Sequence, residues 1–266
     1  MPDEIKQYGY IADEIQDSDY ILGGLNLPTE VLREDGQWDL FLPEIEIQRN
    51  EKYETFNCTS FGTLNCLEIL FKRLFGEERN WSERYVGICA GTNPALGGNS
   101  PQKVIETIRK DCGLLNDVVL PMNDADTLEE YYSPNPIPWL MKEFGRKFLE
   151  EYRIGHEWLW RDSQRENKIN CLKDALQYSP LGCAVCAWEK DGGLYVKPTG
   201  AEDNHWCLIF GYDDGKYWKI FDSYDSTIKF LDWNYNFERV KRYHLEKIVR
   251  HHWWDFISKW IEEIFK

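Results

Sequence analysis

The sequence has little basic charge and no long apolar run, and these two shortages exclude several classes of protein. It contains 31 lysines and arginines against 46 aspartates and glutamates, which gives a formal net charge of −15 at pH 7. An acidic surface repels phosphates, so we expect neither a nucleic acid nor an anionic membrane as a partner. No apolar stretch reaches the roughly 20 residues that a transmembrane helix needs.

The first residues, Met1 to Lys6, are polar and acidic and lack the apolar core of a secretory signal. The chain contains eight cysteines, and an even number is common in disulfide-bonded proteins. Without a secretory signal, and in a chain of this length, free thiols are the better interpretation. We therefore expect a cytoplasmic or virion-associated protein.

What the sequence does contain is enough apolar material for a large core. Its 266 residues are 42% hydrophobic and 15% aromatic, which excludes a disordered polar chain. The length suits one large domain or two tightly joined lobes. The abundant tryptophan and tyrosine favour a bulky core over a carbohydrate-binding platform.

The first half of the chain is rich in helical patterns. Residues 1–45 are acidic and loop-rich and are interpreted as an arm with short strands. Apolar residues at helical spacing, with serine or glycine at the ends, predict helices from Cys58 to Gly76, from Ser100 to Gly113 and over residues 137–153. Residues 77–100 and 114–136 read as irregular structure.

The second half is rich in strand patterns, over residues 181–188, 205–212, 217–222 and 227–233. This order predicts an α+β protein with two lobes, 46–150 and 151–245, and a cleft between them. The last segment, 246–266, is predicted to be an amphipathic helix that packs on the protein or on a partner subunit. Cys183 and Cys186 have metal-like spacing, but an apolar strand points their sulfurs to opposite faces, so we expect no metal and no cofactor.

Cys58 is the strongest candidate for chemistry in the first half. A nucleophilic cysteine must be a thiolate, and an ordinary thiol titrates near pH 8.5, so it needs help. The start of a helix supplies partial positive charge and unpaired N–H groups. Cys58 lies at the predicted start of its helix, although a buried structural cysteine is the alternative.

His205 and Asp222 are the candidates in the second half. The Asp213-Asp214-Gly215 segment predicts a hairpin turn between their strands. One turn places His205 directly opposite Asp222, and the other places the two on a diagonal. Both registers put the side chains on one face of the sheet. A carboxylate beside an imidazole fixes its tautomer and stabilises the imidazolium ion.

Together these segments resemble the papain-like cysteine peptidase family, in the branch found in phages and bacteria. The segment from Cys58 to Glu68 matches the family's Cys-x-x-Phe-[Ser/Gly]-[Ala/Thr] motif, which has a glutamate ten residues after the nucleophile. The strand that begins with His205 ends in Gly211-Tyr212, as in the family. Asp222-Ser223-Tyr224 is similar to the family's Asn-Ser-Trp.

Two shorter segments support the resemblance, which covers about residues 40–245. Ser179-Pro180-Leu181 is similar to a family segment that precedes a strand, and Gly97-Gly98 is similar to the segment that contacts the substrate. The resemblance implies a helical lobe that carries Cys58 and an antiparallel β-barrel-like lobe that carries His205, with the active site in the cleft between them.

The resemblance also implies a mechanism and a substrate. Cys58 would attack a peptide bond of a peptide or protein and form a thioester acyl-enzyme, His205 would shuttle the proton and Asp222 would orient the ring. The family places a glutamine that stabilises the oxyanion six residues before the nucleophile, where this chain has Lys52. Gln48 is the candidate replacement, and losing such a donor lowers rates on the order of 10² to 10³-fold.

Three functions remain open at this stage. The first is a peptidase. The second is a thiol hydrolase that acts on another acyl substrate, such as a peptidoglycan cross-link or an amide side chain. The third is a catalytically silent binding or virion protein that retains the fold, which the displaced glutamine and the predicted C-terminal helix would suit.

Overall fold

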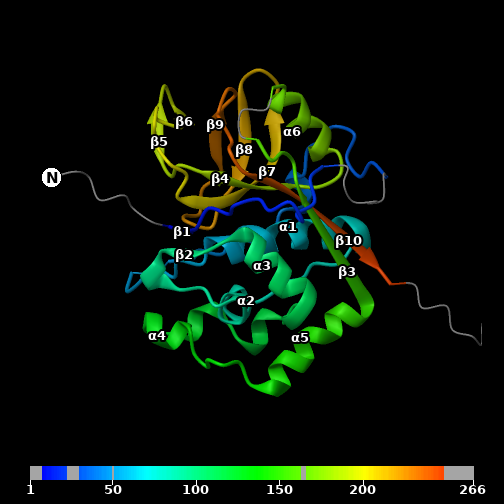
Figure 1. Cartoon of the computed structure of the whole chain (residues 1–266), viewed down its shortest axis with the longest axis vertical. Coiled ribbons are helices and arrows are strands. Elements are labelled where there is room, and N and C mark those ends of the chain that lie inside the picture. Colours follow the sequence, from blue (N-terminus) through cyan, green and yellow to red (C-terminus); the bar gives the residue numbers. More distant parts are fainter. Residues whose placement is uncertain (1–7, 23–29, 50, 163–165, 249–266) are drawn as a thin grey trace, which may run out of the picture.

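A computed structural model describes residues 8–22, 30–49, 51–162 and 166–248 of the chain. The protein has two lobes, one built mainly of helices and one built around a sheet (Figure 1). The predicted C-terminal helix lies outside the described residues, apart from positions 246–248. Residues 246 and 247 belong to the last strand, so that part of the prediction was wrong.

The helical lobe contains five α-helices, α1 (Cys58–Phe75), α2 (Glu83–Ala90), α3 (Pro101–Thr107), α4 (Leu128–Tyr131) and α5 (Trp139–Glu151). A π-helical turn, Ile108–Cys112, continues α3. Gly76 ends α1 in the left-handed conformation, and Ser100 caps α3 by accepting a hydrogen bond from the Lys103 N–H. The predicted helices at Cys58, Ser100 and residues 137–153 are therefore confirmed.

The other lobe contains an eight-stranded sheet in the order β3-β10-β4-β7-β8-β9-β6-β5. The strands are β3 (Tyr152–Trp158), β4 (Leu181–Val185), β5 (Glu189–Asp191), β6 (Leu194–Val196), β7 (His205–Asp213), β8 (Tyr217–Phe221), β9 (Lys229–Asp232) and β10 (Val240–Lys247). Neighbours are antiparallel except β6 and β9. In the described part of the chain the outermost strands do not pair with each other, so the sheet is barrel-like but open.

Several elements were missed by the sequence patterns. Residues 77–100 were interpreted as irregular, yet they contain α2, and α6 (Lys168–Leu176) was not predicted either. Strand β3 was assigned partly to the preceding helix, and β10 was not predicted as a strand. Four 3₁₀ turns complete the described chain, at Asp39–Phe41, Pro94–Leu96, Asp117–Val119 and Met122–Asp124.

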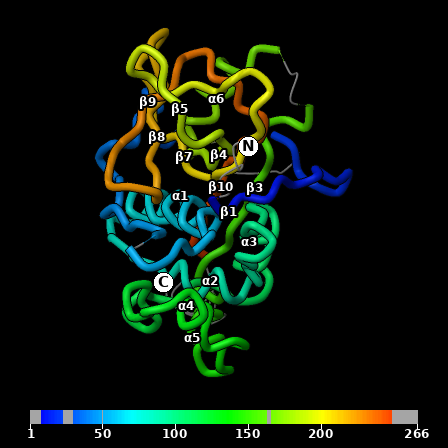
Figure 2. The backbone as a smooth tube through the Cα atoms, turned by 90° about the vertical axis from the view of Figure 1, so that its left-hand side faces the viewer, coloured from blue at the N-terminus to red at the C-terminus, as the bar shows by residue number. Residues whose placement is uncertain are grey.

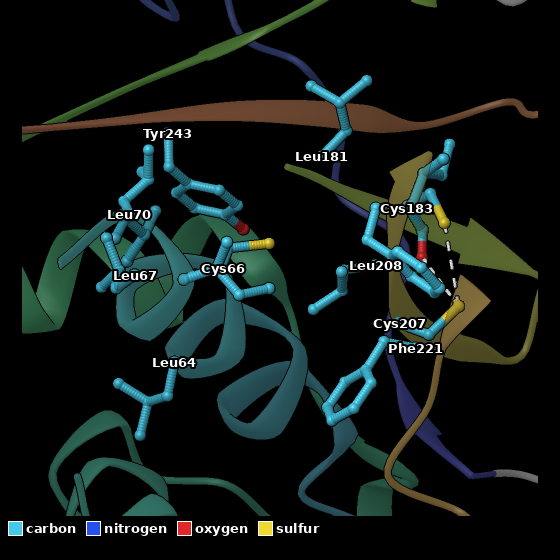
Figure 3. Packing of buried hydrophobic residues seen from close by; sticks show 14 of the residues in the cluster. Leu64, Cys66, Leu67, Leu70, Leu181, Cys183, Cys207, Leu208, Phe221 and Tyr243 are labelled. Carbon is cyan, nitrogen blue, oxygen red and sulfur yellow. Dashed lines mark hydrogen bonds between the residues drawn. The ribbon is translucent and has the colours of Figure 1, made fainter. Parts of the chain in front are cut away.

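Helix α1 lies where the two lobes meet, and its inner face packs against the sheet. Leu64, Leu67 and Leu70 of α1 are buried near Leu208 and Tyr243 of the strands (Figure 3). The tube view shows α1 and the short strand β1 (Gly9–Tyr10) at the junction between the sheet and the remaining helices (Figure 2). This packing fixes the start of α1 against β7, which places the candidate residues at the junction of the lobes.

The hairpin of β7 and β8 adopts the second of the two predicted registers near Asp222. Leu208 pairs with Phe221, which places His205 on the diagonal from Asp222. A bulge further along β7 shifts the register toward the turn. None of the helices in the described part of the chain has the length and apolar composition that crossing a membrane requires.

Candidate active site

Cys58 is the first residue of α1, and its side chain is fully buried. The chain enters the helix through a sharp turn in which Phe56 has a positive φ of 56°. The Asn57 side chain holds this turn, because its amide donates to the Glu83 carbonyl at 2.8 Å and its oxygen accepts from the Ser60 hydroxyl at 2.7 Å. The thiol therefore lies at the positive end of the helix dipole, where a thiolate is stabilised.

The surroundings of Cys58 nevertheless keep its thiol neutral in this structure. Burial raises the pKa of Cys58 well above its ordinary value, and the carboxylates of Glu54 and Asp222 raise it further. Backbone hydrogen bonds from Trp206 and Thr59 act in the opposite direction. A nucleophilic thiolate at this position therefore requires that the site open to water or that a cation form beside it.

His205 and Asp222 are brought together as the sequence predicted. The ring Nε2 of His205 lies 2.6 Å from Oδ1 of Asp222, and both side chains are fully buried. Burial would raise the pKa of Asp222, but His205 and the buried Lys229 ammonium hold it below its ordinary value. The carboxylate is therefore ionised and fixes the orientation of the imidazole.

The other ring nitrogen of His205 faces a different environment. Nδ1 is buried, and within the described part of the chain it has no hydrogen-bonding partner. The next residue along β7, Trp206, donates its backbone N–H to the sulfur of Cys58. The structure thus places the thiol against the same end of β7 that carries the unpartnered nitrogen, although no hydrogen bond joins the sulfur to the ring.

Gln48 is fully buried beside these residues. Its backbone N–H donates to the Ser223 carbonyl at 2.8 Å, and its side-chain oxygen accepts from the Ser223 hydroxyl at 2.8 Å. The side-chain nitrogen donates to the Tyr8 carbonyl at 2.9 Å and to Oε1 of Glu54 at 2.8 Å. Gln48 is thus anchored next to Asp222 and already holds a carbonyl oxygen, that of the N-terminal arm. Lys52, by contrast, is exposed and pairs with Asp126 at 2.5 Å.

Residues 8–10 of the N-terminal arm lie against the site. Strand β1 (Gly9–Tyr10) runs parallel to β2 (Gly98–Asn99), with Gly9 level with Gly98. A side chain on Gly9 would meet the backbone of Phe56, since a Cβ built there lies 2.4 Å from the Phe56 carbonyl carbon. The arm therefore lies against the turn before Cys58. Its strand β1 also pairs with Gly98, one of the two predicted substrate contacts. Gly97, the other, ends a 3₁₀ turn.

Aromatic side chains of the arm contact His205 and its neighbour Trp206. Tyr8 approaches His205 edge-on at 5.8 Å between ring centroids, and its N–H donates to the Asn204 carbonyl at 3.2 Å. Tyr10 stacks on Trp206 at 5.9 Å. Tyr8 and Tyr10 therefore contribute to the burial of His205 and Cys58, together with Trp188 and Tyr224, which also lie against the His205 ring.

Sequence reasoning missed three residues of the site. Glu54 was overlooked because a carboxylate four residues before a cysteine fits no catalytic pattern. The carbonyl of Tyr8 enters through backbone contacts, which no side-chain pattern reveals. Lys229 has a detectable signal, because it is a lysine within the predicted strand 227–233, on a sheet face where apolar residues are expected.

Comparisons with known proteins bear on the fold. The sequence matches no family model and no curated protein. Among solved structures, the digestive procathepsin L 3 of Tenebrio molitor larval midgut is similar, with a TM-score of 0.61 and 19% identity over 89% of this chain and 75% of that chain. The bromelain protease of Ananas comosus, in complex with the E64 inhibitor, has a TM-score of 0.55 and 18% identity over 79% of this chain and 98% of its own.

A clostridial structure has a comparable TM-score. The clostridial cysteine protease Cwp84, after propeptide cleavage, has a TM-score of 0.59 and 16% identity, covering 79% of this chain but 57% of that chain. At such identities the likeness establishes the fold alone. This chain has the two-lobed α+β fold of the papain-like cysteine proteases.

Proposed function

We propose that this protein is a cysteine peptidase that hydrolyses peptide bonds through Cys58, His205 and Asp222. The observation that carries the proposal is the environment of His205. Asp222 holds Nε2 of the ring at 2.6 Å, while Nδ1 is buried and has no partner in the described chain. The backbone N–H of the next residue, Trp206, donates to the sulfur of Cys58. This arrangement suits a base that takes a proton from a thiol.

The proposed reaction follows from these positions. His205 takes the proton of Cys58, and the thiolate attacks the carbonyl carbon of the peptide bond. The oxyanion is held by the Gln48 side-chain amide and the N–H at the start of α1. The C–N bond breaks as His205 protonates the leaving amine, which leaves a thioester. His205 then deprotonates a water molecule, whose attack releases the acid and restores the thiol.

Hydrolysis by this route requires that the arm leave the site. The Tyr8 carbonyl accepts from the Gln48 amide that this proposal assigns to the oxyanion, and the buried thiol is neutral. Moving the arm would hydrate the thiol and release the amide of Gln48. The intact chain is therefore expected to react slowly, in proportion to the fraction of molecules with the arm displaced.

The variant Gly9→Ala tests this proposal in the full-length chain. Gly9 has a φ of 108° and no room for a Cβ against Phe56, so the substitution displaces the arm. We expect a peptidyl chloromethyl ketone to alkylate Cys58 at least about tenfold faster than in the wild type. Hydrolysis of an unfolded protein substrate should rise in parallel. Mass spectrometry of tryptic peptides and release of labelled fragments are the measurements.

Two controls define the outcome. Gly193→Ala changes a glycine with a φ of 93° that has open space around it, and it should leave both rates unchanged. Cys58→Ala in the Gly9→Ala chain should abolish both labelling at that position and hydrolysis. The proposal fails if the displaced-arm protein cleaves nothing and its Cys58 reacts no faster than Cys66, a cysteine buried in the core.

A silent binding protein is the second candidate, because the covered site and the neutral thiol favour it. In such a protein the arm would be a permanent part of the core. Gly9→Ala would then lower the melting temperature without exposing a reactive thiol. Labelling that remains slow in a destabilised but folded Gly9→Ala protein would support this candidate and exclude the peptidase.

A further inference from the structure

Lys229, the first residue of β9, places a buried ammonium group behind the candidate site. Its side chain is 1% exposed. The Nζ atom donates to Oδ2 of Asp222 at 2.6 Å and to Oδ1 of Asp225 at 2.8 Å, and it lies 4.9 Å from the ring centroid of Trp188. Lysine is almost never fully buried unless it is paired. Here the pairing is with the carboxylate that holds the imidazole.

The two oxygens of Asp222 are divided between two partners. Oδ1 lies 2.6 Å from Nε2 of His205 and also accepts the Tyr224 N–H at 3.1 Å, whereas Oδ2 lies 2.6 Å from Nζ of Lys229. Contacts on both oxygens fix the plane of the carboxylate, because rotation would break one of them. The imidazole ring is fixed through that plane.

The positive charge of Lys229 balances the negative charge of Asp222. Burial lowers the pKa of a lysine, yet Asp222 and Asp225 raise the pKa of Lys229 above its ordinary value. Asp225 is partly exposed, so water screens its charge, while Asp222 is fully buried. Without Lys229, Asp222 would be a buried anion with His205 as its main counter-charge. The pair would then hold its proton more firmly.

We propose that Lys229 is a positioning residue, which neutralises Asp222 and thereby sets how firmly His205 holds its proton. A catalytic imidazole must both accept a proton from the thiol and give it to the leaving amine, so its affinity for the proton has to be moderate. The catalytic meaning of this inference rests on the proposed peptidase function. The electrostatic inference does not, and it can be measured in the resting protein.

The test is an NMR titration of labelled histidine in four full-length proteins: wild type, Lys229→Met, Asp222→Asn and the double variant. His205 is assigned by the signal missing from His205→Gln. The groups around its ring are Asp222 and Lys229 from the sheet lobe, Cys58 at the start of α1, Glu54 in the segment before α1, and Tyr8 and Tyr224 on its flanks. The substitutions change only the first two.

The expected titration midpoints have a definite order. Lys229→Met leaves the anion uncompensated, so the His205 midpoint rises by about one pH unit. Asp222→Asn leaves the lysine cation with only the partly exposed Asp225 as a counter-charge, so the midpoint falls by a similar amount. The double variant removes both charges, and its midpoint returns to lie between those of the single variants, near the wild-type value.

Hydrolysis provides the second measurement, with each variant placed in the full-length Gly9→Ala chain. Each single substitution should lower the rate at least about tenfold, and the double variant should regain part of that loss. Lys219→Met is the matched control, because Lys219 lies on β8 and pairs instead with Asp39 at 2.9 Å. It should change neither the midpoint nor the rate.

The outcomes separate the inference from the proposed function. If Lys229→Met leaves the His205 midpoint where it is in the wild type, Lys229 only fills the core and the inference is wrong. If the double variant is as far displaced as either single variant, charge compensation is likewise excluded. If the midpoints shift in the expected order while no protein cleaves peptides, the inference stands and the peptidase proposal fails.

Discussion

In the described part of the chain, two buried histidines each contact a carboxylate at the same distance. His205 lies 2.6 Å from Asp222, and His156 on β3 lies 2.6 Å from Oε1 of Glu106 on α3. A buried lysine accompanies each pair. Lys229 contacts the carboxylate of the first pair at 2.6 Å, whereas Lys241 contacts the ring of the second, 3.3 Å from Nδ1 of His156.

The position of the lysine distinguishes the two pairs. At His156 both ring nitrogens have partners, and burial together with the Lys241 ammonium lowers the pKa of the ring to about 4, against the opposing effect of Glu106. At His205 the lysine lies behind the carboxylate, so the outer nitrogen remains without a partner. A histidine–carboxylate contact alone therefore does not make a catalytic base. The proposed base differs from His156 in having a second nitrogen that no other group in the described chain occupies.

The largest expected effect concerns Gln48, which lies beside the first pair. Gln48→Ala in the Gly9→Ala chain should lower the rate of peptide hydrolysis on the order of 10² to 10³-fold, because it removes a donor to the oxyanion. Lys52→Gln is the matched variant at the position where the sequence resemblance places the glutamine. Its side chain is exposed, so the rate should stay nearly the same. Equal losses in both variants would contradict the role given to Gln48.

A smaller effect concerns stability at the second pair. The folded pKa of His156 is about 4, below its unfolded value of 6.5, so the unfolded state binds more protons between these pH values. The free energy of unfolding should therefore rise with pH through this window, by up to about 3 kcal/mol from His156. The groups that face its ring are Glu106, Arg109 and Lys241.

Denaturant unfolding of the wild type and His156→Gln between pH 4 and pH 6.5 measures this contribution. Glutamine can keep a hydrogen bond to Glu106 but does not titrate. The difference in unfolding free energy between the two proteins should thus change with pH in the stated direction. A difference that is constant across the window would show that His156 does not bury its ring in the neutral form.

The fold was predictable where the sequence pattern is local. The helix at Cys58 and the hairpin of His205 and Asp222 depend on spacing and on turn residues, and both were predicted. Strand β10 was not predicted as a strand, because polar and apolar residues mix along it. Its pairing with β3 joins segments nearly ninety residues apart, which only the folded chain reveals.

The side chains of the candidate site were predictable from the sequence, but their protonation and their burial were not. The sequence of the arm does not predict that the Tyr8 carbonyl accepts from Gln48. That contact uses a backbone atom and depends on how β1 pairs with Gly98. The neutral thiol of Cys58 follows from its burial and from the nearby carboxylates of Glu54 and Asp222. Sequence patterns predict which groups meet, while the protonation of those groups depends on what covers them.

The most direct test compares the two histidines through the reactivity of Cys58. In the full-length Gly9→Ala chain, the rate of Cys58 alkylation by iodoacetamide should remain high well below the ordinary thiol pKa, because the His205 imidazolium stabilises the thiolate. Adding His205→Ala should abolish this low-pH reactivity, whereas adding His156→Gln should leave it intact. If His205→Ala leaves the pH profile of alkylation unchanged, the thiol and the imidazole are not coupled and the peptidase assignment is contradicted.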